Sequence, residues 1–222
     1  MSNQRHPAKH KQQAPINEEW LAVRDFVQKH IGTAITTLLV IAVVVVGIWT
    51  FTQRRTQQVE AAQQLLATAQ SSSQFEEIID RFPRSEAAPL AQLSLAKLHF
   101  DMGRYRDALD TYQAFQDQWT DHPLGKTAEM GVLFSLEALG ASDQIQQAEE
   151  GFRAFADNNP DHYLYPQARL GEARCKEQLG RLEEAQAVYE SFIESHPDNP
   201  WEGEIQERLS ELERKIRRQQ SS

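Results

Sequence analysis

The sequence lacks the residue patterns on which most enzyme sites are built. Its 222 residues include one cysteine, Cys175, so no intrachain disulfide can form. The glycines stand singly, which leaves no phosphate-binding loop and no GxGxxG fingerprint. The seven histidines show no HExxH or other metal-ligand spacing, and no serine lies in a GxSxG motif. We therefore expect a protein that is not an enzyme and that binds neither a cofactor nor a metal.

Basic residues are scarce in the larger part of the chain. The formal net charge is −9, and residues 52–222 carry 18 basic and 29 acidic side chains. Binding to a phosphate backbone requires clustered Lys and Arg. An acidic region of this size therefore argues against nucleic acid as the partner.

Residues 31–51 contain no charged side chain and read IGTAITTLLVIAVVVVGIWTF. As a helix with a rise of about 1.5 Å per residue, this stretch is roughly 30 Å long, the thickness of a bilayer hydrocarbon core. A buried helix of a soluble protein is one alternative, but such a helix rarely stays uncharged for so long. A cleaved signal peptide is another, but it has a shorter apolar run and a small-x-small cleavage site, which is missing here. We expect one uncleaved transmembrane helix, with Trp49 near the headgroups.

The residues before this span divide into two parts. Residues 1–15 are polar and show no apolar periodicity, so we expect a disordered tail. Residues 16–30 predict a juxtamembrane amphipathic helix that lies at the headgroups, with Lys29 on its polar side. Five basic residues precede the span, whereas Arg54 and Arg55 follow it. This imbalance favours a cytoplasmic N-terminus and places the rest of the chain across the membrane.

Residues 52–218 predict a domain of repeated helical hairpins. Gly103, Gly140 and Gly180 each separate two apolar helical patterns, and three additional residues follow the second glycine before its next helix. Asn199 is expected to cap a final helix. The predicted units span residues 52–84 (a degenerate copy), 89–123, 126–160 and 166–197, followed by a capping helix over 200–218.

Three of these units share a triplet of small and aromatic residues. An alanine is followed after four residues by an aromatic side chain and after seven by a phenylalanine. The triplets are Ala108, Tyr112 and Phe115; Ala148, Phe152 and Phe155; and Ala185, Tyr189 and Phe192. The alanine lets the two helices of a hairpin approach closely, and the aromatics fill the groove of the next hairpin. Because one hairpin cannot bury its apolar face alone, successive hairpins are expected to stack.

Each unit also closes with a proline: Pro123, Pro160 and Pro197. The order of glycine, alanine, aromatic, phenylalanine and proline resembles the tetratricopeptide repeat over most of residues 74–200. The spacings between glycines are 37 and 40 residues, against about 34 in the repeat template, and the signature of its first helix is weak here. The resemblance implies an all-α fold, in which a single N-terminal transmembrane helix precedes a solenoid of helical hairpins.

The resemblance also implies a concave surface, lined by the first helix of each hairpin, that binds other proteins. In the tetratricopeptide register the inward positions are Leu93, Lys97, Phe100, Met130, Phe134, Glu137, Arg174 and Glu177. Leu93, Met130 and Phe134 are equally consistent with core positions. Lys97 and Arg174 are the stronger candidates, because a cation in a groove can bind a peptide carboxylate.

The layout of the chain resembles a narrower group as well. The segment NEEWLAVRDFVQKH, one span and an immediate helical repeat domain are similar to the bacterial family of the ancillary SecYEG translocon subunit. This resemblance implies an inner-membrane protein with a periplasmic repeat domain. Its partners would be the SecYEG translocon, periplasmic chaperones or their clients. Two alternatives stay open: a cytosol-facing targeting or import receptor, and a self-associating protein that organises the envelope.

Overall fold

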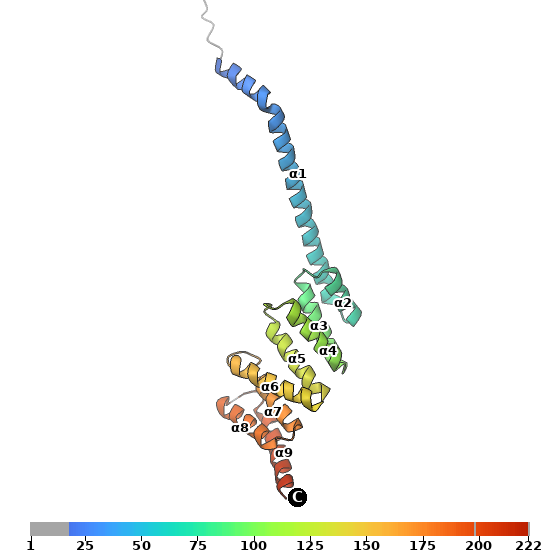
Figure 1. The fold of residues 1–222 in the computed structure, drawn as a ribbon, viewed down its shortest axis with the longest axis vertical. Coiled ribbons are helices and arrows are strands. Elements are labelled where there is room, and N and C mark those ends of the chain that lie inside the picture. The colour runs from blue at the N-terminus through green and yellow to red at the C-terminus, as the bar shows by residue number, and fades with distance from the viewer. Residues whose placement is uncertain (1–17, 198, 222) are drawn as a thin grey trace, which may run out of the picture. The chain divides into compact units, whose positions relative to one another are not determined.

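The computed structural model describes residues 18–197 and 199–221, and these residues form nine helices and no strand. The expected disordered tail, residues 1–15, lies outside them. Two compact units divide the chain, residues 1–57 and residues 58–222. The helices follow one another along the chain with short connections (Figure 1). The predicted all-α fold is confirmed.

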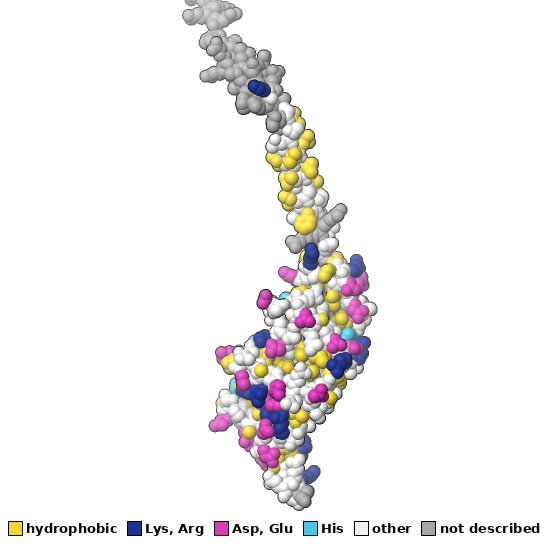
Figure 2. Space-filling view, in the orientation of Figure 1, with side chains coloured by type: hydrophobic (Ala, Val, Ile, Leu, Met, Phe, Trp, Pro, Cys, Tyr) yellow, Lys and Arg dark blue, Asp and Glu magenta, His cyan; other side chains and the backbone are white. Residues whose placement is uncertain are grey.

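The first helix, α1 (Glu18–Thr68), is 51 residues long and has no break at either end of the apolar stretch. The expected juxtamembrane helix, the expected span and the residues after it are therefore parts of one helix. Consecutive apolar side chains such as Leu38, Leu39, Val40 and Ile41 are all exposed. Figure 2 shows hydrophobic side chains on the surface of this helix. The segment is long and apolar enough to cross a membrane.

The second unit contains the other eight helices, and each packs against its neighbours in the chain. Their bounds are α2 (Ser72–Arg81), α3 (Ala87–Asp101), α4 (Tyr105–Gln118), α5 (Gly125–Leu139), α6 (Ser142–Asn158), α7 (Tyr165–Gln178), α8 (Leu182–Ser195) and α9 (Glu202–Gln220). Helix α5 also contacts α3 and α7, the first helices of the hairpins on either side of it. Four core clusters follow in sequence order along the unit. This arrangement is the predicted solenoid of stacked hairpins.

Glycine makes the tight turn within each of the three hairpins. Gly103, Gly140 and Gly180 have φ values of +73°, +79° and +75°, a left-handed conformation that other residues adopt only at a cost. We expected the three additional residues to lie between Gly140 and the next helix, and this prediction is wrong. The extra residues lie inside α6, which has 17 residues where α4 and α8 have 14. A helix absorbs them because one more turn continues its hydrogen-bond ladder without a new connection.

The three triplets of small and aromatic residues are buried throughout. The central rings of the first two press on the first helix of the following hairpin at a glycine. A Cβ atom on Gly131 would lie 2.5 Å from the Tyr112 ring, and one on Gly171 would lie 2.8 Å from the Phe152 ring. The glycines therefore let each ring approach the backbone of the next hairpin, which fixes the stacking of the solenoid.

Both ends of the solenoid are covered. At the start, Phe75 and Ile78 of α2 pack with Ala62 of α1, as the degenerate first unit predicts. At the other end, the buried apolar face of α9 packs on the last hairpin. Asn199 does not cap this helix as expected. Its Oδ1 accepts a hydrogen bond from the Trp201 N–H at 2.9 Å and so closes a turn before the helix. Trp201 is the residue at the cap position.

Candidate protein-binding site

The helix α3 carries the predicted surface residues that remain most accessible. Lys97 is exposed, and its Nζ lies 2.7 Å from Asp101 Oδ2 on the same helix. Leu93 and Phe100 are half-buried, and the Phe100 ring lies 5.1 Å from the Tyr105 ring. Pairing between two exposed side chains is weak, so Lys97 can exchange Asp101 for the carboxylate of a partner.

Arg174 of α7 has a different setting. Its Nε and Nη2 donate hydrogen bonds to the two carboxylate oxygens of Glu137 on α5, each at 2.8 Å. The guanidinium carbon lies 5.8 Å from the centre of the Phe134 ring. Burial opposes the charge of Arg174, but the hydrogen bonds and the negative charge of Glu137 together outweigh burial and raise the pKa of the guanidinium. Glu137 of the neighbouring hairpin thus takes the place that the prediction gave to a partner's carboxylate.

The remaining predicted positions are also occupied within the fold. Glu177 accepts a hydrogen bond from the Tyr189 hydroxyl at 2.9 Å, and Lys215 Nζ of α9 lies 3.7 Å from its other oxygen. Met130 is only 2% exposed and packs in the core. It offers no surface to a partner, so its placement in a binding groove is corrected. Most of the residues predicted to line the groove therefore make contacts within or between the hairpins and are not free to bind a partner.

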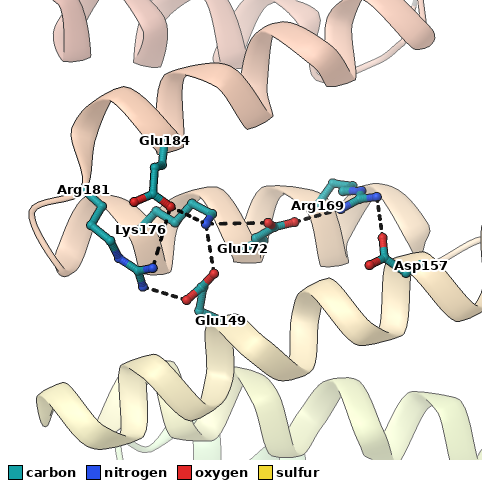
Figure 3. Close-up of polar contacts among 7 residues, drawn as sticks. All are labelled: Glu149, Asp157, Arg169, Glu172, Lys176, Arg181 and Glu184. Atoms are coloured by element: carbon teal, nitrogen blue, oxygen red, sulfur yellow. Dashed lines mark hydrogen bonds and ion pairs between the residues drawn. The ribbon is translucent and has the colours of Figure 1, made fainter.

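A buried charge network, which the sequence did not reveal, links α6, α7 and the start of α8 (Figure 3). At its centre, Lys176 is 7% exposed. Its Nζ lies 3.0 Å from Glu149, 3.0 Å from Glu184 and 3.9 Å from Glu172. Arg181 Nη2 donates to Glu149 at 2.6 Å. The ion pairs with Glu184 and Glu149 outweigh the burial of Lys176 and raise its pKa, so the ammonium group stays charged.

Two histidines of the interhelix connections have structural roles. His122 Nδ1 accepts a hydrogen bond from the Leu124 N–H at 3.1 Å, and His162 Nδ1 accepts one from the Leu164 N–H at 3.2 Å. Each ring packs edge-on against the last phenylalanine of the preceding triplet, at 5.5 and 5.6 Å. A His two residues before the first turn of a helix is the sequence signal that could have found this role.

Among groups that could carry chemistry, the described part of the chain offers neither a metal cluster nor an accessible thiol. Within residues 18–197 and 199–221, no three His, Cys, Asp or Glu side chains are placed to hold a metal ion. Cys175 is buried, and burial raises the pKa of its thiol to about 12, which keeps it protonated and unreactive. The charged side chains of the core pair with one another.

Comparison with known proteins agrees with this fold. The family model described as tetratricopeptide repeat-like domain matches residues 24–138, and the model described as tetratricopeptide repeat matches residues 134–200. No curated protein matches the chain.

Two solved structures resemble the chain in fold. Both are crystal structures from Podosopora anserina of nearly identical TPR-like repeats described as putative kinesin light chain, and one of the two is a single-substitution variant. Their identities to this chain are 16% and 17%, and the TM-score is 0.56 for each. Each alignment covers 76% of this chain and 89% of the other. Repeats of this kind generally mediate binding to other proteins, and the present chain belongs to the tetratricopeptide repeat-like family.

Proposed function

We propose that the chain is a non-enzymatic protein-binding adaptor, which α1 anchors in the bacterial inner membrane with the repeat domain in the periplasm. The observation that supports anchoring is the exposure of large apolar side chains all along α1 from Ile35 to Phe51. The helices α2–α9 instead bury most of theirs in the four core clusters. An apolar surface of this extent requires a cover, and a bilayer fits its length.

The proposed orientation and partners rest on patterns in the sequence. The basic residues before the span favour an N-terminus in the cytoplasm. The layout resembles the ancillary SecYEG translocon subunit, so the proposed partners are the translocon, periplasmic chaperones or their clients. The accessible side of α3, with Lys97 at its centre, is the proposed contact surface. Confinement beside a membrane partner raises the effective concentration without adding contacts.

Site-specific photocrosslinking in intact cells tests this function. A photoreactive amino acid replaces Lys97 in the full chain, and the control carries it at Glu190, an exposed residue of α8. We expect the chain in the membrane fraction and a discrete adduct with an export or chaperone protein from position 97 only. Recovery of the full chain from the soluble fraction, or the same adducts from both positions, would contradict the proposal.

A further inference from the structure

A groove opens between α2 and α4, with α3 as its floor. Glu76 and Asp80 of α2 and Asp110 of α4 form its rim, and Gln92 and Leu95 of α3 lie beneath them. Its volume is about 410 Å³, within the range of ligand-binding clefts. No Lys or Arg is among the described residues that line it. This acidic groove lies on the second-helix side of the hairpins, away from the Lys97 surface.

The same groove occurs two hairpins further along the chain, where it is filled. Gly103 and Gly180 are 77 positions apart, and the same shift places Asp157 at the position of Asp80 and Arg169 at that of Gln92. Arg169 Nη2 donates to Asp157 at 2.8 Å, and its Nη1 donates to Glu172 at 2.9 Å (Figure 3). The cavity beside Arg169 is smaller, about 240 Å³. In that copy the guanidinium therefore neutralises Asp157 and Glu172.

The acidic groove has a carboxylate, Asp80, at the position of Asp157, but it has no cation at the position of Arg169. Asp80, Glu76 and Asp110 are exposed, and none of them forms an ion pair with another described residue. Gln92 stands where the arginine would be and is 6% exposed. Its Nε2 donates to the Thr111 carbonyl oxygen at 3.2 Å, and its Oε1 accepts no hydrogen bond within the described part of the chain. This oxygen and the rim carboxylates are accessible, so one donor group from outside can bind them together.

We propose that the acidic groove binds a basic segment of a partner protein, whose arginine enters between α2 and α4 as Arg169 does between α6 and α8. The apolar floor at Leu95 receives the methylene groups or a neighbouring apolar side chain of that segment. Arginine suits the site because its planar donors can bind a carboxylate and an amide oxygen at once. This inference rests on the proposed protein-binding function and adds a second contact surface with a defined chemistry.

The test uses the full chain in nanodiscs of neutral lipid, with empty discs as background. The probe is an end-capped amphipathic peptide with two arginines one helical turn apart beside leucines. Its twin carries citrulline, which is uncharged, in place of arginine. Fluorescence anisotropy measures the Kd. The double variant Asp80→Asn with Asp110→Asn is compared with Asp117→Asn, which removes an exposed carboxylate of α4 outside the groove.

We expect saturable binding of the arginine peptide that weakens at least about tenfold in the double variant, because two charge-assisted hydrogen bonds are lost. Binding should be unchanged in Asp117→Asn and absent for the citrulline peptide. Gln92→Arg should fill the groove from within and abolish binding. Equal Kd values for the double variant and the wild type, or equal binding of the two peptides, would overturn the proposal. Such a failure would leave membrane fractionation and crosslinking at Lys97 unaffected, so it is distinct from failure of the proposed function.

Discussion

Replacement of Lys176 by methionine should strongly destabilise the repeat domain. The two side chains have a similar length, so the change removes the charge with little change in volume. Glu149 is 3% exposed and Glu172 is 4% exposed. Without the ammonium group, both of these buried carboxylates lose a partner. Removing one member of a buried ion pair costs about 3–5 kcal/mol.

The expected loss is at the lower end of this range, about 3 kcal/mol in the free energy of unfolding. Arg181 still donates to Glu149, and Arg169 still donates to Glu172, so neither carboxylate is left wholly unpaired. The matched control is Lys97→Met, which removes an exposed cation that also has an acidic neighbour. Exposed pairs contribute about 0–1 kcal/mol, so the control should change stability little.

The loss should depend on pH. Burial opposes the charge of Glu149, but its ion pairs with Lys176 and Arg181 together outweigh burial and lower its pKa. A carboxyl with a lowered pKa in the folded state stabilises the fold above its unfolded pKa, about 4.3, and loses this contribution as the pH falls through the folded value. The difference between the wild type and Lys176→Met should therefore be full at pH 7 and shrink below about pH 4.3.

Urea unfolding of the full chain in mild detergent, followed by circular dichroism, measures both effects. The free energy of unfolding is determined for the wild type, Lys176→Met and Lys97→Met at neutral and acidic pH. If Lys176→Met costs no more than Lys97→Met at pH 7, the buried charge network does not hold α6, α7 and α8 together. A cost that stays constant on acidification would refute the assignment of Glu149 as its charged partner.

Three further outcomes follow from the packing and from the membrane segment. Gly131→Ala should lower the free energy of unfolding by about 1–3 kcal/mol, because the new methyl group meets the Tyr112 ring; urea unfolding should show no such loss for Gly125→Ala, which meets nothing within 4 Å. Gly140→Ala should cost about 1–2 kcal/mol in the same assay, because its φ of +79° strains any residue with a side chain. Val44→Arg, within the expected span 31–51, should disfavour membrane insertion by about 3 kcal/mol, measured as a shift of the chain into the soluble fraction. A chain that stays wholly in the membrane would contradict the placement of Val44 inside the bilayer.

The sequence predicts the fold well where one residue type has one physical role. Glycines at the turns could be placed because only they accept a positive φ cheaply. The regular order of small and aromatic residues indicated the stacked hairpins, and the triplet at Ala148 was found in spite of three additional residues. Their place inside α6 could not be predicted, since a longer helix and a longer connection leave the same spacing in the sequence.

The candidate site was harder to predict, because its properties depend on contacts between hairpins. Arg174 and Glu137 are 37 residues apart, and each alone looks like an available surface charge. The sequence also gave no indication that Lys176 is buried and paired, because its partners lie on three different helices. Met130 shares a register position with Leu93, yet it lies deeper in the core. Register identifies a helix face, but the neighbouring hairpin decides which side chains on that face are accessible.

The measurement that tests the central claim most directly is the membrane topology of the full chain. A reporter that is active only outside the cytoplasm is fused after Ser222, and a matching fusion is made at the N-terminus. The account predicts activity from the C-terminal fusion alone, in the membrane fraction. Activity from the N-terminal fusion alone would place the repeats in the cytoplasm and contradict the proposed periplasmic adaptor.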